Sequence, residues 1–308
     1  MSFLLEQISS KRSIHHPSID IAFAVDGQYL NYCGVTIYSI IKNNSHMNIR
    51  FHVLTSDKDI IGKEKFTDLE KSYPNISIDF YILNKDIYKR CQIKQHFNDA
   101  IYYRLSIVEI LSKTLDSVLY LDADILCTGK IDELLTIDIS RYCIAAVKDI
   151  KSEECLKSIG LDLNNTGYFN SGVMLINIRN WQKDNTFKQF MQLIYKDDYK
   201  HPDQDVLNII FNNKVLFLNN KFNYVNAEDE GKVFIHYTGA VKPWHLAHGF
   251  NINYIKYLWA SPWADLNLKP SLGYKPARKY ARILWKTHHP IGAIKWFFIY
   301  LFRKFKVN

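Results

Sequence analysis

Two carboxylates directly after an apolar run are the strongest chemical feature of this sequence. Residues 118–121 are Val-Leu-Tyr-Leu, and Asp122 and Asp124 follow them two positions apart. On an extended backbone, side chains at positions i and i+2 point to the same side, so the two carboxylates are expected to converge. Mg²⁺ and Mn²⁺ prefer such oxygens and often complete their shell with a substrate diphosphate. The alternative is a pair of acids in a solvated loop or at a helix N-cap, but the end of a buried strand favours the metal.

A second candidate segment, residues 234–244, has a histidine, a glycine and a lysine after another apolar run. His236 is a candidate third ligand, and an imidazole beside carboxylates favours Mn²⁺ over Mg²⁺. Lys242 can neutralise a phosphate. Taken alone, His236 has the alternative of a hydrogen-bonded core histidine, and Lys242 that of an ordinary surface charge.

A third candidate is the polar start of a predicted helix. Asp203, Gln204 and Asp205 follow Pro202, which suits a first helical turn. Carboxylates and amides can bind the hydroxyls of a sugar ring. Polar side chains in this position often only cap the helix, and we expect that role for at least one of the three.

Two further polar segments lie beside predicted strands. In residues 24–29, Asp26 can accept a hydrogen bond from a uracil or ribose and Tyr29 can stack on a base. The alternative is a simple turn from strand to helix. Residues 169–172, Phe-Asn-Ser-Gly, are predicted to form a small polar turn before a strand.

Short apolar runs alternate with helical periodicity around these segments. This alternation predicts βαβ units and a mostly parallel sheet, in which ligands bind at the carboxyl ends of the strands. The expected strands are residues 19–25, 49–54, 76–83, 117–121, 144–147, 173–176, 215–218 and 233–237. The expected helices are residues 32–42, 60–71, 102–111, 181–195 and 203–211.

The net charge of +8 comes from the C-terminal end of the chain. Ten basic and no acidic residues follow residue 265, which leaves 29 of the 39 basic residues against 31 acidic ones elsewhere. This near-neutral body argues against nucleic-acid binding. Residues 275–306 interleave cations with aromatics, a pattern that favours an anionic membrane interface. The alternative is a helix packed on the protein's own core.

The remaining composition bears on the cellular compartment. The five cysteines are scattered without a CxxC motif, so we expect free thiols in a reducing compartment. Residues 1–19 do not resemble a signal peptide, and no segment reaches the roughly 20 apolar residues that span a bilayer. We therefore expect a cytoplasmic protein.

Taken in order, the candidate segments resemble glycosyltransferase family 8, from about Asp20 to Trp244. The likeness rests on Asp122-Ala123-Asp124, Phe169-Asn170-Ser171-Gly172, Pro202-Asp203-Gln204-Asp205 and His236-Tyr237-Thr238-Gly239 with Lys242-Pro243-Trp244. Within the family, residues 235–245, Ser261-Pro262-Trp263 and the basic tail are similar to the hexosyltransferases of the bacterial lipopolysaccharide outer core.

The resemblance implies an α/β protein with the GT-A fold. Residues 1–265 would form a Rossmann-like nucleotide-binding domain with a mixed, mostly parallel sheet, and residues 266–308 a helical, basic, aromatic tail that associates with the membrane. The implied reaction transfers glucose or galactose from a UDP-sugar, with retention, to a lipid-linked lipopolysaccharide core, forming an α-linkage. The implied location is the inner face of the bacterial cytoplasmic membrane.

The resemblance also implies roles for individual residues. Mn²⁺ or Mg²⁺ would be held by Asp122, Asp124 and His236. The donor-binding residues would be Ala24, Asp26, Gln28 and Tyr29 at the uridine, with Arg104, Asp122, Ala123, Asn170, Gly239 and Lys242 at the diphosphate and sugar. The catalytic residues would be Gln204, Asp203 and Asp149.

The implied mechanism differs from that of a retaining glycosidase, which places two carboxylates about 5–5.5 Å apart and uses one as nucleophile. Asp122 and Asp124 are assigned to the metal. Gln204, which matches the family residue closest to the reacting carbon, carries an amide, which is a poor nucleophile. We therefore expect attack by the acceptor on the face that UDP leaves, through an oxocarbenium-like ion pair.

Two other interpretations compete with this one. A strand ending in Asp-x-Asp also opens the haloacid-dehalogenase-like phosphatases, with the first aspartate, here Asp122, as nucleophile. That family places the motif near the N-terminus, whereas here it is mid-chain. The other is a non-enzymatic protein that binds a membrane or polyanion through its basic tail.

Overall fold

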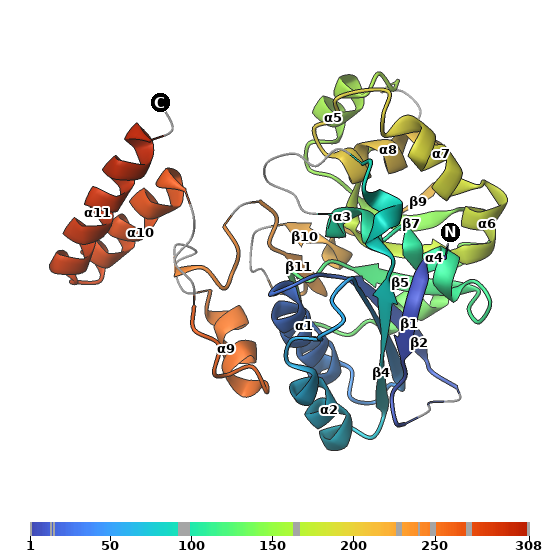
Figure 1. The fold of residues 1–308 in the computed structure, drawn as a ribbon, viewed down its shortest axis with the longest axis horizontal. Coiled ribbons are helices and arrows are strands. Elements are labelled where there is room, and N and C mark those ends of the chain that lie inside the picture. Colours follow the sequence, from blue (N-terminus) through green and yellow to red (C-terminus); the bar gives the residue numbers. More distant parts are fainter. Residues whose placement is uncertain are drawn as a thin grey trace.

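An eight-stranded mixed sheet forms the centre of the protein in this computed structural model, which describes residues 2–12, 14, 16–91, 99–162, 167–225, 230–239, 241–246, 251–268 and 273–306. The strand order is β1-β4-β3-β2-β5-β8-β7-β9, and Figure 1 shows the sheet with the helices around it. Strands β2, β3, β4 and β5 run parallel, as do β7 and β9, whereas β1 and β8 are antiparallel to their neighbours. The strands are Leu4–Ile8 (β1), Ile19–Ala24 (β2), Ile49–Thr55 (β3), Ile76–Leu83 (β4), Ser117–Leu121 (β5), Ile144–Lys148 (β7), Phe169–Asn177 (β8) and Val215–Leu218 (β9).

Helices cover both faces of this sheet, which explains why its central strands β2, β5 and β8 are largely buried on both sides. In β2, Ile21 and Phe23 pack with α1, α2, α9 and a small second sheet, while Ala22 points to the layer of α3, α4, α6, α7 and α8. The helices are Tyr29–Asn43 (α1), Lys63–Ser72 (α2), Ala100–Tyr103 (α3), Ser106–Leu111 (α4), Ser152–Ser158 (α5), Ile178–Lys183 (α6), Thr186–Leu193 (α7), Pro202–Ile210 (α8), Ile252–Ala260 (α9), Tyr274–Lys286 (α10) and Pro290–Phe305 (α11). The prediction of an α/β protein is confirmed.

Some elements differ from those expected. The helix expected at 181–195 is two helices, α6 and α7, separated at Asn185, whose φ of 50° is left-handed and interrupts the helix. The helix expected at 102–111 is likewise divided into α3 and α4. The edge strand β1 was not predicted. Strand β8 begins at Phe169, so the polar segment 169–172 lies inside a strand and the predicted turn there is wrong.

The small second sheet has the order β10-β11-β6 and brings His236 to the main sheet. Its strands are Ile125–Cys127 (β6), Tyr224–Val225 (β10) and Phe234–His236 (β11). Because β6 follows β5 after three residues and pairs antiparallel with β11, His236 lies opposite Ile125. All five cysteines are free, as predicted, and all five are buried.

Helix α9 and the residues that follow it, as far as Leu268, pack against the body. The indole of Trp263 is fully buried, donates from Nε1 to Asn31 Oδ1 at 3.1 Å and packs against Phe66. It lies directly on Gly34 of α1, where an added Cβ would come within 2.1 Å of the ring. Leu266 and Leu268 also contact the core.

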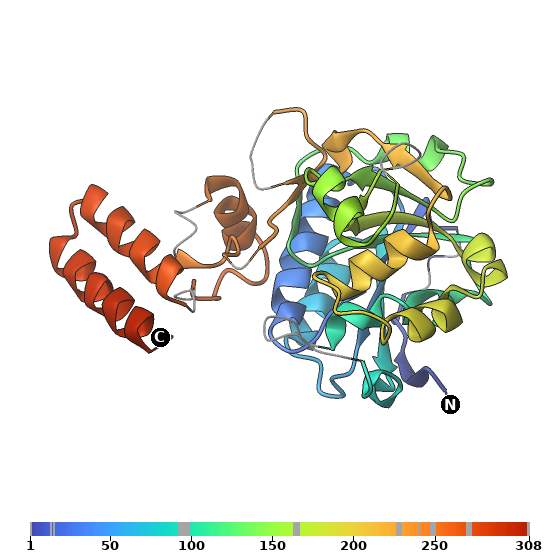
Figure 2. The same ribbon diagram turned by 90° about the horizontal axis from the view of Figure 1, so that it is seen from above.

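Helices α10 and α11 form a hairpin that projects away from the body (Figures 1 and 2). The two helices hold each other through an edge-to-face contact between Tyr280 and Trp296 and a guanidinium contact of Arg278 with Tyr300. The predicted boundary near residue 265 precedes this hairpin, although residues 269–272 lie outside the described residues. Of the described helices, none combines the length and apolarity needed to cross a membrane.

Candidate active site

The sheet topology gathers the candidate residues at one edge. Asp26, Asp122 and Asp149 follow the carboxyl ends of β2, β5 and β7, which run in the same direction. Because β8 is antiparallel, its first residues, including Asn170 and Ser171, lie at this same edge. The placement agrees with the expectation that ligands bind at the carboxyl ends of parallel strands.

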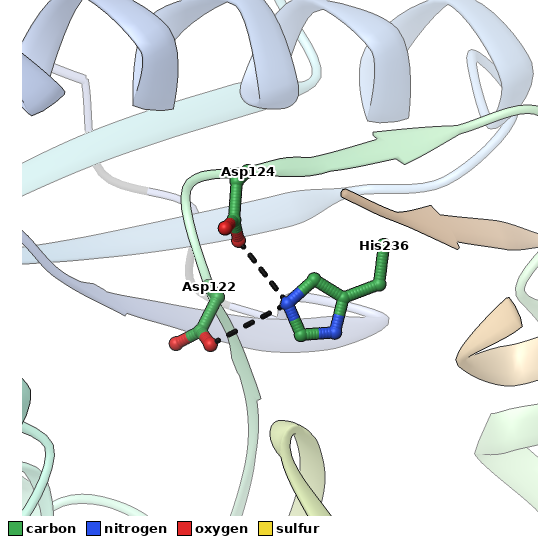
Figure 3. A group of neighbouring side chains, drawn as sticks. All are labelled: Asp122, Asp124 and His236. Atoms are coloured by element: carbon green, nitrogen blue, oxygen red, sulfur yellow. Dashed lines mark ion pairs between the residues drawn. The ribbon is translucent and has the colours of Figure 1, made fainter. Parts of the chain in front are cut away.

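Asp122, Asp124 and His236 form a compact cluster at the centre of this edge. One ligand atom from each lies within 4.8 Å of the other two. Nε2 of His236 is 3.2 Å from Asp124 Oδ1 and 3.7 Å from Asp122 Oδ2, so both carboxylates face the same ring nitrogen (Figure 3). The expected convergence of the three side chains is present.

The backbone that produces this convergence is not extended as we expected. Strand β5 ends at Leu121, and residues 122–124 make a turn into β6. The buried hydroxyl of Thr36 on α1 donates towards the carbonyls of Ala123 and Ile125, at 3.0 and 2.7 Å. Ala123 itself is buried in the core. The hydrogen bonds from Thr36 of α1 hold this turn in a conformation in which both carboxylates face His236.

Each carboxylate uses its other oxygen to bind a cationic side chain of the protein. Oδ1 of Asp122 accepts from Arg104 Nη2 at 3.0 Å and from the Tyr120 hydroxyl. Oδ2 of Asp124 pairs with Lys242 Nζ. Burial alone would raise the pKa of Asp124, but Lys242 and His236 outweigh it and hold that pKa well below its usual range. Both carboxylates are therefore held with one oxygen directed at His236.

The chemistry of this cluster fits a divalent cation. Oδ1 of Asp124 is buried and accepts no hydrogen bond from any described residue, although Nε2 of His236 lies near it. A buried carboxylate oxygen without a donor is costly. Two carboxylate oxygens and an imidazole nitrogen around one point form a donor set typical of Mn²⁺ or Mg²⁺ sites.

Gly172 provides the space that this cluster needs. A Cβ built on it would lie 2.2 Å from His236 Cε1 and 2.9 Å from Asp122 Oδ2. Gly172 also accepts the Asp122 backbone N–H through its carbonyl at 2.9 Å. No side chain fits at this position without displacing a ligand.

We expect Gly172→Ala to weaken Mn²⁺ binding by about 10–100-fold, the loss typical when a metal ligand is misplaced through its surroundings. Calorimetric titration of the protein with Mn²⁺ measures it. Gly292→Ala is a matched control, because its nearest neighbour is a leucine side-chain atom of the hairpin, 3.3 Å away. Unchanged Mn²⁺ affinity in Gly172→Ala would show that the cluster tolerates the methyl group.

Arg104 connects this cluster to helix α8. The buried guanidinium donates from Nη1 to the Ser171 hydroxyl and carbonyl at 2.8 and 3.0 Å and lies 3.2 Å from Asp203 Oδ2. Burial raises the pKa of Asp203, and Arg104 opposes this only in part. Oε1 of Gln204 accepts from the Ser171 N–H at 2.9 Å.

Asp205 has the capping role that we expected for one of these three residues. Its carboxylate accepts from the His201 N–H at 2.8 Å and from the Tyr168 hydroxyl. Its side chain is buried and turned towards the start of the helix. It stabilises α8 and leaves Asp203 and Gln204 to the site.

The segment after β2 lies at the same edge of the sheet. Its residues differ in their exposure and in the hydrogen bonds that they already make. Asp26 already accepts from Thr55 and from the N–H and hydroxyl of Ser56, at 2.9–3.1 Å. Ala24 is half-buried and Gln28 is exposed. Tyr29 is 38% exposed and meets the Trp244 ring edge-on, at 5.5 Å.

Three predicted residues remain. Gly239 is exposed, and its left-handed φ of 85° with open space around it leaves its backbone accessible. Asp149 and Asn170 contact each other through the Asn170 amide, at 3.2 Å. Asn170 lies between Asp149 and the cluster of Asp122, Asp124 and His236, and it also accepts the Gly172 N–H.

Sequence reasoning missed three residues of the site. Thr36, Tyr120 and Asn223 each bond to a residue of the cluster or to its backbone. Thr36 lies in the middle of a helix and Tyr120 in the middle of a strand. The sequence around each is that of an ordinary core position, so nothing in it indicates a role in the site. Asn223 follows a phenylalanine in an irregular segment, and no motif marked it.

Models of two segments of one protein family match nearly the whole of this chain. The glycosyl transferase family 8 model matches residues 20–247, and the model of the C-terminal part of that family matches residues 251–304. The chain belongs to glycosyl transferase family 8. The resemblance stated from the sequence is confirmed, and neither the phosphatase nor the non-enzymatic interpretation is supported.

Individual relatives of this family 8 enzyme support the same assignment. It is 31% identical to the lipopolysaccharide 1,2-glucosyltransferase of Escherichia coli K12, over 93% of this chain and 91% of the relative. It is also 31% identical to the lipopolysaccharide 1,3-galactosyltransferase of Salmonella typhimurium, over 92% and 91%. The crystal structure of the galactosyltransferase LgtC with donor and acceptor sugar analogues superposes with a TM-score of 0.69 at 26% identity, covering 79% of this chain and 96% of that one. The predicted GT-A fold and metal-dependent glycosyltransferase class are confirmed.

Proposed function

We propose that this enzyme transfers glucose or galactose from a UDP-sugar, with retention, to the core oligosaccharide of lipopolysaccharide. The similarity to a lipopolysaccharide 1,2-glucosyltransferase and a lipopolysaccharide 1,3-galactosyltransferase supports the reaction class. The observation that carries the proposal is the cluster of Asp122, Asp124 and His236, set between Arg104 and Lys242. A cation site flanked by two protein cations suits a diphosphate leaving group.

The proposed cation is Mn²⁺ or Mg²⁺, with Mn²⁺ favoured because one ligand is an imidazole. When bound, it would neutralise charge that develops on the leaving diphosphate. Lys242 Nζ, held by Asp124 and the Tyr237 carbonyl at 2.9 Å, would add a second positive charge there. The exposed backbone of Gly239 would offer its N–H to the same group.

The donor hexose would lie against the residues between β7 and α8. Asp149, Asn170 and Asp203 would accept from and donate to its hydroxyls, with Arg104 oriented by Asp203 and Asp122. Gln204 has its carbonyl oxygen committed to the Ser171 N–H, which makes it still less suited to be a nucleophile. This favours attack by the acceptor hydroxyl on the face that UDP leaves, with the departing phosphate oxygen accepting its proton.

The uridine would lie over the segment after β2. Asp26, fixed by Thr55 and Ser56, would accept from the base or ribose, and the exposed ring of Tyr29 offers a stacking surface. Ala24 and Gln28 would border the same pocket. Ala123 would contribute its backbone between the two metal ligands.

The experiment that tests this function is donor hydrolysis by the purified protein without acceptor. UDP-glucose and UDP-galactose are each incubated with Mn²⁺, with Mg²⁺ and with chelator, and released UDP is measured. Slow UDP release that requires the metal, from one donor only, supports the proposal and identifies the sugar. No release from either donor together with no metal-dependent UDP binding would refute it.

We further propose that the α10–α11 hairpin forms a unit separate from the catalytic body and binds the inner face of the cytoplasmic membrane, where a lipid-linked acceptor would be presented. Trp285, Phe298 and Phe302 are each more than 60% exposed. Residues 273–306 carry nine basic and no acidic residues. A groove of about 430 Å³ between the helices combines Arg278 and Arg282 with apolar side chains. Exposed aromatics beside cations are typical of helices at an anionic membrane surface.

We expect a chain that ends at Leu268, which retains Trp263, to lose cosedimentation with vesicles of anionic phospholipid while keeping donor hydrolysis. The full chain should bind such vesicles and release them as salt rises, because about 1 kcal/mol per basic residue near the surface comes from screened attraction. Neutral phosphatidylcholine vesicles are the control. Equal binding of the shortened and full chains to anionic vesicles would overturn the role of the hairpin.

A further inference from the structure

Asn223 touches His236 on the side of the imidazole that faces away from the two carboxylates. Its side chain is buried, with 3% of the residue exposed. Its Oδ1 lies 2.9 Å from His236 Nδ1, and its Nδ2 lies 2.8 Å from Asn170 Oδ1. Asn223 thus connects His236 of the proposed cation site by hydrogen bonds to Asn170, one of the residues proposed at the hexose.

The direction of these hydrogen bonds is determined at their far end. The Gly172 N–H, which can only donate, lies 3.1 Å from Asn170 Oδ1, and an oxygen of Asp149, which accepts when ionised, lies 3.2 Å from Asn170 Nδ2. The orientation of the Asn170 amide is therefore fixed.

The fixed amide of Asn170 then determines its neighbours in turn. Asn170 Oδ1 accepts a donor from Asn223, which must be Nδ2–H, so Asn223 presents its oxygen to the imidazole. That oxygen accepts only if His236 carries its proton on Nδ1. Each hydrogen bond in this series therefore fixes which atom of the next group donates and which accepts.

We propose that Asn223 is a positioning residue that holds His236 in the Nδ1-protonated tautomer and so keeps the Nε2 lone pair directed at the cation. In a neutral imidazole with Nδ1 protonated, Nε2 is unprotonated and free to ligate. Nε2 is the atom that faces Asp124 Oδ1 and Asp122 Oδ2. The proposal rests on the proposed function of these three residues as the cation site.

The direct test measures Mn²⁺ affinity in the presence of UDP, from the paramagnetic resonance signal of free Mn²⁺, with no turnover involved. Asn223→Leu, which removes the acceptor, should weaken Mn²⁺ binding by about 10–100-fold. Asn223→Asp keeps an acceptor oxygen for the imidazole but loses the N–H that Asn223 donates to Asn170, so it should weaken Mn²⁺ binding less than Asn223→Leu does. Unchanged Mn²⁺ affinity in Asn223→Leu would overturn the proposal.

A double-mutant cycle separates this role from a general loosening of the site. In a His236→Ala background, Asn223→Leu should have no further effect on Mn²⁺ affinity, because the group through which it acts is gone. The same loss in both backgrounds would overturn the assignment. Asn44→Leu is the matched control: Asn44 is fully buried and accepts the Ile131 N–H at 2.9 Å. It should lower the melting temperature but not Mn²⁺ affinity, and an equal Mn²⁺ loss there would count against the proposal.

The tautomer can also be observed directly, in the unsubstituted enzyme without metal. Nitrogen-15 chemical shifts of the His236 ring, assigned by difference from His236→Gln and recorded where the imidazole is neutral, should report protonated Nδ1. Protonated Nε2 would refute the proposal. If the unsubstituted enzyme with UDP binds no Mn²⁺, the proposed function fails, and these shifts still decide the tautomer.

Discussion

Asp124→Ala is expected to abolish metal-dependent UDP binding and to lower donor hydrolysis and transfer by at least about 10³-fold. Asp124 is buried and serves two neighbours, with Oδ1 facing His236 and Oδ2 holding Lys242. Its removal deletes a ligand and leaves the largely buried Lys242 ammonium without its carboxylate, next to the position proposed for the cation. Both changes oppose cation binding.

The measurement is UDP release at saturating donor across a range of Mn²⁺ concentrations. The matched control is Asp184→Ala, which breaks another aspartate–lysine pair, Lys214 with Asp184 at 2.6 Å. That pair lies near the end of β8 and the start of β9, at the opposite edge of the sheet from the site. The control should keep its activity. Near-normal turnover of Asp124→Ala at saturating donor would exclude the assigned metal site.

Gln204→Ala is expected to lower kcat by about 10²–10³-fold, the effect of removing one well-placed polar group from a reacting centre. UDP affinity should change little, because the Gln204 side chain bonds to Ser171, which is not one of the residues proposed at the diphosphate. The loss would therefore appear in turnover rather than in binding.

The alternative for Gln204 is a structural role, since it also ties α8 to β8. Asn208 tests this, because it lies one turn later on α8 and bonds to the N–H and carbonyl of Phe169 at 2.8 and 3.0 Å. Asn208→Ala should lower the melting temperature and leave kcat within about tenfold. A comparable loss of kcat in both variants, or a large loss of UDP affinity in Gln204→Ala, would assign Gln204 to structure or binding.

The sequence was sufficient for the parts of the fold that depend on local pattern. Strands β3 and β4 carry an apolar residue at every second position, Ile49, Phe51 and Val53 in β3 and Ile76, Ile78 and Phe80 in β4, and their positions agree with the prediction within one residue. The edge strand β1 has the sequence Leu-Leu-Glu-Gln-Ile, partly exposed and without strict alternation, so only its pairing with β4 makes it a strand. The break between α6 and α7 depends on the backbone of one residue, Asn185, which periodicity does not register.

The same distinction holds at the site. Asp122, Asp124 and His236 could be proposed because their chemistry is unusual at the end of apolar runs. Asn223 could not, since its role exists only through partners 53 and 13 positions away in the chain. The turn at residues 122–124 was wrongly expected to be extended, because the bonds that hold it come from the middle of α1.

Because Trp263 is buried against Gly34, the segment that the family's C-terminal model matches does not fold as a unit of its own. The family's C-terminal segment, residues 251–304, contains both α9 with Trp263, which complete the core beneath α1, and the exposed hairpin. Exchanging this whole segment between relatives would therefore alter the hydrophobic interior as well as the hairpin. A chimaera that is meant to change only the outer surface should be joined after Leu268, so that each α1 keeps the tryptophan that fits its glycine.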